Sequence, residues 1–210
     1  MREAEITRGA PEPDQSEARR SLSRAEPAAS IYWHRRQHTP LQYSDLIHTR
    51  RSIRAFAATP VEETKLNTIL QAANRAPSAG NLQAYEIYVV RGEEQRRKLV
   101  KCCFDQQFIA QAPVALVFCT NPARAEKYGE RGAQLYSLQD ATIACTFALL
   151  AVDDLGLACV WVGALAADAV RDIAGAPASQ TPVAVLPIGY GAEDPVRTER
   201  RALGDLVHEC

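Results

Sequence analysis

The sequence lacks the residue patterns that mark a metalloprotein or a disulfide-bonded secreted protein. Its six cysteines form no CxxC pair and lie mostly inside apolar runs, and its four histidines do not form HExxH. Metal ligands need convergent spacing, and disulfide frameworks belong mainly to small secreted chains. We therefore expect buried thiols in a reducing compartment and no metal site.

The sequence also has no large excess of positively or of negatively charged residues. The 24 Lys and Arg residues are offset by 25 Asp and Glu residues, so the formal net charge is -1. Such a chain has no global field to attract nucleic acid, and it contains no aromatic-plus-basic motif of a nucleic-acid-binding module.

We see no signal-peptide core at the start and no apolar stretch of about 18 residues, the length of a membrane span. The composition favours a soluble, cytoplasmic protein that acts on small molecules, with no nucleic acid and no membrane as partner.

Signatures of two large enzyme classes are absent as well. The glycines of "GYGAEDPVRTERR", residues 189–201, do not form GxGxxG, and no strand-to-helix unit follows them. This excludes the Rossmann dinucleotide fingerprint. No catalytic triad or acid/base pair is recognisable, so we assign no catalytic side chain.

The 210 residues are 47% hydrophobic, which is enough for one folded domain. Residues 1–40 are rich in Glu, Arg, Ser, Ala and Pro and have few apolar anchors. Such a segment cannot bury enough surface to order itself. We expect a flexible N-terminal arm at 1–40, or alternatively a partner-binding segment that docks through Ile31-Tyr32-Trp33. The folded domain is expected at 41–210.

Hydrophobic periodicity predicts helices at residues 41–50, 59–76, 93–103, 135–155 and 166–174, and strands at 85–90, 114–119, 157–162 and 183–190. Helix 59–76 carries a predicted capping box from Thr59 to Glu62, with Pro60 at its first position. Helix 135–155 is largely apolar, so we expect burial on nearly all sides, and Gly156 is its predicted C-terminal glycine. A long central helix favours a three-layer α+β fold over a doubly wound sheet.

The stretch "RRSIRAF" concentrates positive charge just after a predicted helix, through Arg50, Arg51 and Arg54 with Ser52 among them. Arginine forks bind phosphate oxygens bidentately, and a hydroxyl adds one donor. The pattern indicates either a phosphate site or a solvated basic turn. These residues alone leave both readings open.

The cluster "APSAGNLQA" joins a predicted helix to a predicted strand through small and turn-forming residues. Pro77, Ser78, Asn81 and Gln83 supply turn geometry with mixed donors and acceptors, which suit the polar edge of a heterocycle. An ordinary connection is the alternative.

Two further segments are candidates for binding. In "WVGALAADAV", the strand end at Val162, Gly163 and Ala164 could present backbone N–H groups to a ligand, although packing alone would also explain the small residues. The C-terminal "DPVRTERR" supplies three more arginines, Arg197, Arg200 and Arg201.

These segments, taken in order, resemble the FMN-dependent nitroreductase family. The resemblance rests on "RRSIRAF", on "APSAGN" followed by Gln83, on "RGAQLYSLQDATIACTFALLAVDDLGLACVWVGA" and on "PVAVLPIGYGAEDPVRTERRAL", and it covers about residues 43–209. The sequence departs from the family pattern in three places: Ala84-Tyr85 stands where members commonly have Pro and an aromatic, Gly191 follows Tyr190 where many members have Pro, and Thr198 stands at a frequent Lys.

The resemblance implies a three-layer α/β/α sandwich with a mixed, mainly antiparallel sheet, in a homodimer that holds two FMN molecules at its interface. It assigns the FMN phosphate and ribityl chain to Arg50, Arg51, Ser52 and Arg54, and part of the ring edge to Pro77, Ser78, Asn81 and Gln83 of the partner subunit. Val162, Gly163 and Ala164 would face flavin N5 through backbone N–H groups. Arg200 would close on the phosphate, with Arg197 or Arg201 as substitutes.

The same resemblance implies an oxidoreductase that takes hydride from NADH or NADPH and passes electrons to a small acceptor, such as a nitroaromatic or a quinone, by a ping-pong mechanism. The alternatives are a specialised flavin enzyme, namely a dehalogenase, ring dehydrogenase or flavin-degrading enzyme, and a flavin-binding protein without turnover.

Overall fold

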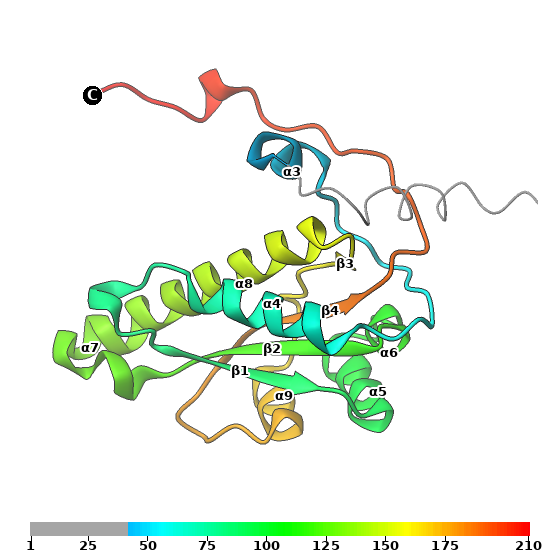
Figure 1. Ribbon diagram of the computed structural model, residues 1–210. Coiled ribbons are helices and arrows are strands. Elements are labelled where there is room, and N and C mark those ends of the chain that lie inside the picture. The colour runs from blue at the N-terminus through cyan, green and yellow to red at the C-terminus, as the bar shows by residue number, and fades with distance from the viewer. Residues whose placement is uncertain (1–41) are drawn as a thin grey trace, which may run out of the picture.

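The structure is a computed structural model that describes residues 42–210 (Figure 1). The predicted arm at 1–40, with its Ile31-Tyr32-Trp33 cluster, lies outside the described residues. The described part has a sheet of four strands in the order β1-β2-β4-β3, and each of the three pairings is antiparallel. The strands are β1 (Tyr85–Val90), β2 (Val114–Thr120), β3 (Ala158–Cys159) and β4 (Pro182–Gly189).

Helices cover both faces of this sheet. Helices α4 (Glu63–Asn74) and α8 (Ser137–Asp154) lie on one face, and α5 (Glu93–Cys102), α6 (Phe108–Gln111) and α9 (Ala167–Ala174) lie on the other (Figure 1). The shorter elements are α3 (Tyr43–Thr49), α7 (Gly129–Arg131), a π-helical turn (Gly132–Tyr136) and three 3-10 segments (Ala79–Asn81, Pro122–Tyr128 and Leu203–Asp205). The predicted three-layer α+β fold with a mainly antiparallel sheet is confirmed.

Strand β2 shows why the sheet can be buried on both faces. Its alternate side chains Val114, Leu116 and Phe118 pack in the layer of α4 and α8. The intervening Ala115, Val117 and Cys119 pack in the layer of α5 and α9. Successive strand residues point to opposite faces, so a strand covered on both sides reads as the continuous apolar run that the sequence shows.

Helix α8 is buried on one side only, which corrects the expectation of burial nearly all round. Its buried face consists of Ser137, Asp140, Ala141, Ala144, Cys145, Ala148, Val152 and Asp153. On the other side, Leu138 and Phe147 are 43% and 37% exposed. Among residues 42–210, the helical run Pro122–Asp154 is also long and apolar enough to cross a membrane by length and composition alone. The expectation of no such stretch was therefore wrong, although α8 packs against the sheet as a core helix.

The start of α4 and the length of β3 differ most from the sequence prediction. Helix α4 starts at Glu63 with Glu62 as N-cap and no side-chain cap bond, so the predicted Thr59–Glu62 capping box is wrong. The Glu62 carboxylate instead accepts from Tyr190 Oη at 2.8 Å, beyond the end of β4. The predicted strand 157–162 shortens to β3, and only Val162 pairs again, as an isolated bridge with Val185.

Two other local predictions are confirmed. Gly156 has a φ of 69° and follows the C-cap residue of α8, as expected for a left-handed glycine that ends a helix. Helix α9 occupies the range predicted from the sequence, starting one residue later, at Ala167.

The core position of Phe118 yields a matched stability test. Phe118 is 0% exposed in the centre of the sheet, whereas Phe104 is 71% exposed. We expect Phe118→Ala to lower the free energy of unfolding by about 3–5 kcal/mol, because it removes buried contacts and leaves a cavity. Phe104→Ala should change it by less than about 0.5 kcal/mol. Denaturant unfolding measures both, and equal losses would contradict the assigned core.

Candidate cofactor site

The basic segment, residues 50–57, is held in an extended conformation at one edge of the sheet. The Ile53 N–H donates to the Cys159 carbonyl of β3 at 3.1 Å, and the Ala57 N–H donates to the Tyr190 carbonyl at 2.8 Å. Ile53 and Phe56 are buried, with 3% and 8% exposure. These backbone bonds and apolar anchors fix where the charged side chains between them emerge.

The three arginines of the segment have different surroundings. The Arg51 guanidinium forms an ion pair with Asp194 and donates to the Pro195 carbonyl at 3.1 Å. The Arg54 backbone N–H donates to the Glu193 carboxylate. Within residues 42–210, neither the Arg50 nor the Arg54 side chain makes a hydrogen bond or an ion pair, so both can take an anionic ligand.

Arg50 lies close to β3, as the thiol of Cys159 indicates. Burial raises the pKa of Cys159 above its usual range, the negative charge of Asp153 adds to this effect, and the positive charge of Arg50 partly offsets it. The basic segment and β3 therefore lie at one sheet edge, and the strand end at 162–164 comes three residues after Cys159.

The strand end itself offers free backbone donors. Val162 is 2% exposed and exchanges two backbone hydrogen bonds of 3.0 Å with Val185, which fixes its position. Gly163 and Ala164 follow it at the surface. No hydrogen bond leads from either N–H group to another residue of the described chain. A Cβ at Gly163 would lie 3.2 Å from Trp161 Nε1, so a side chain there would crowd the indole.

The turn at 77–84 has an unusual backbone. Gly80, Asn81 and Gln83 have φ values of 56°, 56° and 51°. Positive φ is uncommon for residues other than glycine, and such conformations persist where the surroundings impose them, most often at functional sites. Gln83 is the least usual of the three, so its conformation must be imposed by the surrounding contacts.

The backbone of the turn is bonded by two charged side chains that the sequence reasoning did not single out. Asp140 Oδ1 accepts from the Ala79 N–H at 3.0 Å and its Oδ2 accepts from the Ala84 N–H at 3.1 Å. Arg124 Nε donates to the carbonyls of Leu82 and Gln83 at 2.9 and 3.0 Å. The sequence contained a feature that could have identified Asp140: it is an acidic residue on the buried side of an otherwise largely apolar helix.

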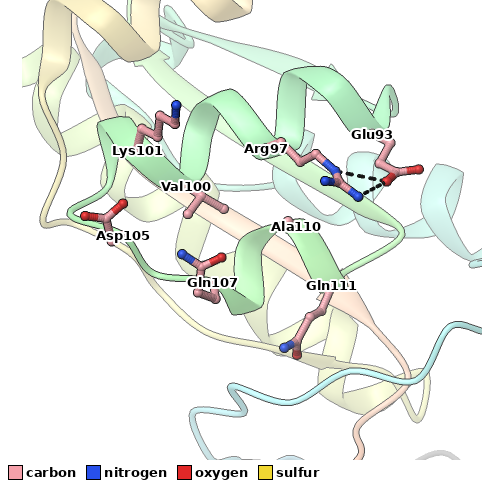
Figure 2. A pocket seen from close by; sticks show the side chains of 8 residues that line it. All are labelled: Glu93, Arg97, Val100, Lys101, Asp105, Gln107, Ala110 and Gln111. Atoms are coloured by element: carbon pink, nitrogen blue, oxygen red, sulfur yellow. Dashed lines mark hydrogen bonds and ion pairs between the residues drawn. The ribbon is translucent and has the colours of Figure 1, made fainter.

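A cavity of about 680 Å³ lies beside this turn. Pro77, Ser78 and Ala79 form one wall, and the other wall comes from the π-helical turn and the first part of α8, through Tyr136, Leu138, Gln139, Asp140, Thr142 and Ile143. Its apolar and aromatic lining suits a planar ring. A second cavity, of about 620 Å³, lies between α5 and α6 (Figure 2) and contains none of the predicted site residues. Its Glu93 and Arg97 form an ion pair on its wall.

One chain does not bring all the predicted residues together. The turn is tied to Asp140 near the start of α8, whereas β3 contacts the later part of that helix, where Cys159 Sγ lies 3.9 Å from the Leu149 carbonyl. Nine residues separate Asp140 from Leu149, or roughly 13 Å along a helix at about 1.5 Å per residue. The turn and the basic segment thus lie toward opposite ends of α8 (Figure 1).

The C-terminal arginines extend from the same sheet edge. Arg197 comes three residues after Asp194, the partner of Arg51. Arg197 and Arg200 are exposed, and neither side chain forms a hydrogen bond or ion pair within residues 42–210. The Arg201 guanidinium donates to the Asp205 carbonyl. Apolar side chains of this segment are also exposed: Val196 is 97%, Leu203 74%, Leu206 56% and Val207 61% exposed.

Comparison with known proteins places this geometry in a family. The model of the Nitroreductase family matches residues 47–108 and 100–190, which include the basic segment, the turn and the strand end. The chain belongs to the nitroreductase family.

Among relatives of this nitroreductase-family chain, a putative NADH dehydrogenase/NAD(P)H nitroreductase of Archaeoglobus fulgidus is 32% identical over 155 residues, 71% of this chain and 85% of that protein. An FMN reductase [NAD(P)H] of Bacillus subtilis is 30% identical over 173 residues, 76% of this chain and 70% of that protein. The structure of the NADPH:FMN oxidoreductase of Vibrio harveyi complexed with NAD+ superposes with a TM-score of 0.73 at 28% identity and covers 79% of this chain and 76% of that one.

Four of the cysteines lie in the interior of this nitroreductase fold. Cys103, Cys119, Cys145 and Cys159 are buried and unbridged. Burial raises the pKa of Cys103 and of Cys119 to about 12, so both stay protonated at neutral pH. No group of three or more His, Cys, Asp or Glu side chains that could hold a metal occurs between residues 42 and 210.

Proposed function

We propose that this protein is an FMN-dependent oxidoreductase that takes hydride from NADH or NADPH and passes electrons to a small acceptor, such as a nitroaromatic or a quinone. The observation that carries the proposal is the sheet edge where Arg50 and Arg54 have no side-chain partner within residues 42–210 and where Gly163 and Ala164 have free N–H groups. Relatives named as FMN reductase and NAD(P)H nitroreductase support the same reaction class.

The residues at this edge fit the polar parts of FMN. Arg50 and Arg54 would bind the phosphate as charge-assisted donors, and Ser52 would add its hydroxyl. Gly163 and Ala164 would donate their N–H groups to the N5 edge of the ring, where fixed donors stabilise developing negative charge without reorganisation. FMN supplies the hydride and electron chemistry when bound, so the chain needs no catalytic side chain of its own.

We propose that the complete site needs two copies of the chain. The turn that would contribute Pro77, Ser78, Asn81 and Gln83 lies toward the other end of α8 from the basic segment. The exposed Leu138 and Phe147 of α8 and the apolar C-terminal side chains would be covered in a homodimer. The partner's turn would then meet the first chain's basic segment, and Arg197 or Arg200 would close on the phosphate.

One open pocket over the ring would serve both donor and acceptor in turn. The oxidised nicotinamide must then leave before the acceptor enters, which gives ping-pong kinetics. The cavity beside the turn is lined by Tyr136, Leu138 and Ile143, which favours flat apolar acceptors over charged ones. We expect the protein in the cytoplasm, where reduced nicotinamide is available.

The proposal predicts a yellow protein whose colour bleaches on anaerobic addition of NADH or NADPH and returns when a quinone is added. The visible spectrum follows both half-reactions, and the two nicotinamides, compared at equal concentration, identify the preferred donor. Colour without bleaching would favour a flavin-binding protein without turnover. A protein that stays colourless and binds no added FMN would refute the proposal.

Arg54→Ala should weaken FMN binding far more than Arg51→Ala. The Arg51 guanidinium is already held by Asp194, whereas that of Arg54 has no partner within the described chain. Loss of one charge-assisted contact to phosphate costs about 1.5–3 kcal/mol, which raises the dissociation constant at least tenfold. Fluorescence titration of the apoprotein with FMN measures both variants. Equal dissociation constants would mean that the phosphate binds elsewhere.

Removal of residues 1–30 should leave both the dimer and the flavin intact, because every residue assigned to the site lies between 50 and 200. Light scattering gives the mass of the truncated protein, and its absorbance spectrum gives the flavin content. A flavin-loaded monomer would contradict the two-chain site. Loss of flavin with the arm would assign a role to the N-terminal segment.

A further inference from the structure

Asp140 is a buried acidic residue that none of the roles above uses. Its side chain lies on the apolar face of α8 and the residue is 2% exposed. A carboxylate in a core is costly unless hydrogen bonds satisfy it. Here both oxygens accept backbone N–H groups, from Ala79 at 3.0 Å and Ala84 at 3.1 Å.

These two N–H groups stand at the two ends of the strained part of the turn. Gly80, Asn81 and Gln83, the residues with positive φ, lie between them. Asp140 therefore fixes the separation between the start and the end of the turn. The backbone conformation of Asn81 depends on that separation, since the Asn81 N–H donates at 3.0 Å to the Ser78 carbonyl, which belongs to the same peptide group as the Ala79 N–H.

The other contacts of the turn are easier to replace. Arg124 donates to the carbonyls of Leu82 and Gln83 from an exposed position, so water can take its place. Ser78 Oγ accepts the Gln83 N–H at 3.0 Å within the turn itself. Within residues 42–210, the side-chain hydrogen bonds between the turn and the buried face of α8 come from Asp140, and water has little access to a residue that is 2% exposed.

We propose that Asp140 is a positioning residue, whose carboxylate holds the turn so that Asn81 meets the ring edge of the flavin. The inference rests on the proposed function. It separates two contributions to cofactor binding: the arginines hold the phosphate, and the Asp140-bonded turn holds the ring.

Asp140→Asn keeps the shape of the side chain but loses one acceptor. The new amide NH2 group then faces a backbone N–H of Ala79 or Ala84, and one of these bonds is lost. The turn leaves its bound-state conformation for part of the time, and the apparent dissociation constant rises in proportion to the lost population. A buried donor left unsatisfied predicts a rise of about tenfold.

The test compares FMN with riboflavin, which has the same ring but no phosphate, on the full-length protein. Asp140→Asn should raise both dissociation constants by the same factor and should shift the spectrum of the bound flavin at saturation. Arg54→Ala should raise the dissociation constant of FMN and leave that of riboflavin unchanged. Ser137→Ala is the matched control, because Ser137 is also buried on α8 but donates to the Ala133 carbonyl of the adjoining π-helical turn. It should leave both constants unchanged.

Asp140→Glu is the second variant, in case the first does not fold. It keeps the charge and both acceptor oxygens but moves them by one methylene, so it should also raise the dissociation constants of FMN and riboflavin by the same factor. A folded Asp140→Asn or Asp140→Glu protein with wild-type constants and spectrum would overturn the inference, since Asp140 would then only stabilise the fold. A wild-type protein that binds neither flavin would overturn the proposed function and the inference with it.

Discussion

The close packing of α8 against the sheet is the constraint on which the rest of the structure depends. Small side chains, Ala141, Ala144 and Ala148, form the centre of its buried face and are all 0% exposed. They let the helix approach β2 and β4, whose larger side chains Leu116, Phe118 and Leu186 fill the layer. One rigid helix thus carries the turn near its start and contacts β3 near its end, so it sets the separation between the two candidate binding elements.

This arrangement explains why an open surface surrounds each half of the site. The basic segment and the strand end share one sheet edge, but neither contacts the turn at 77–84. A cofactor with a phosphate at one end and a ring at the other needs both kinds of surface, and two copies of the chain can supply them if the turn of one faces the edge of the other. The exposed apolar side chains of α8 and of the C-terminal segment are then the expected contact surface between the copies.

The sequence predicted most of the elements, because their signals are local. Continuous apolar runs identified β2 and β4, and helical periodicity identified α4, α5 and α9. The failures involve contacts between distant segments. The Thr59–Glu62 capping box did not form because Tyr190, 128 residues away, bonds the Glu62 carboxylate. The bonds from Asp140 to Ala79 and Ala84 also join segments far apart in sequence. The family was readable from the ordered segments, whereas the side chains that hold those segments in place were not.

The arginines of the basic segment show how the backbone assigns roles to identical side chains. Along an extended chain, alternate side chains point to opposite sides, so Arg51 points away from Arg50 and Ser52. The acidic pair Glu193-Asp194 follows β4 and meets the segment on its far side, where Asp194 pairs with Arg51 and Glu193 accepts the Arg54 N–H. These bonds hold the C-terminal segment against the basic one without using the guanidinium groups of Arg50 and Arg54. Charge pairing on the Arg51 side thus holds the proposed anion site in place, while the side with Arg50, Ser52 and Arg54 stays available for the proposed phosphate.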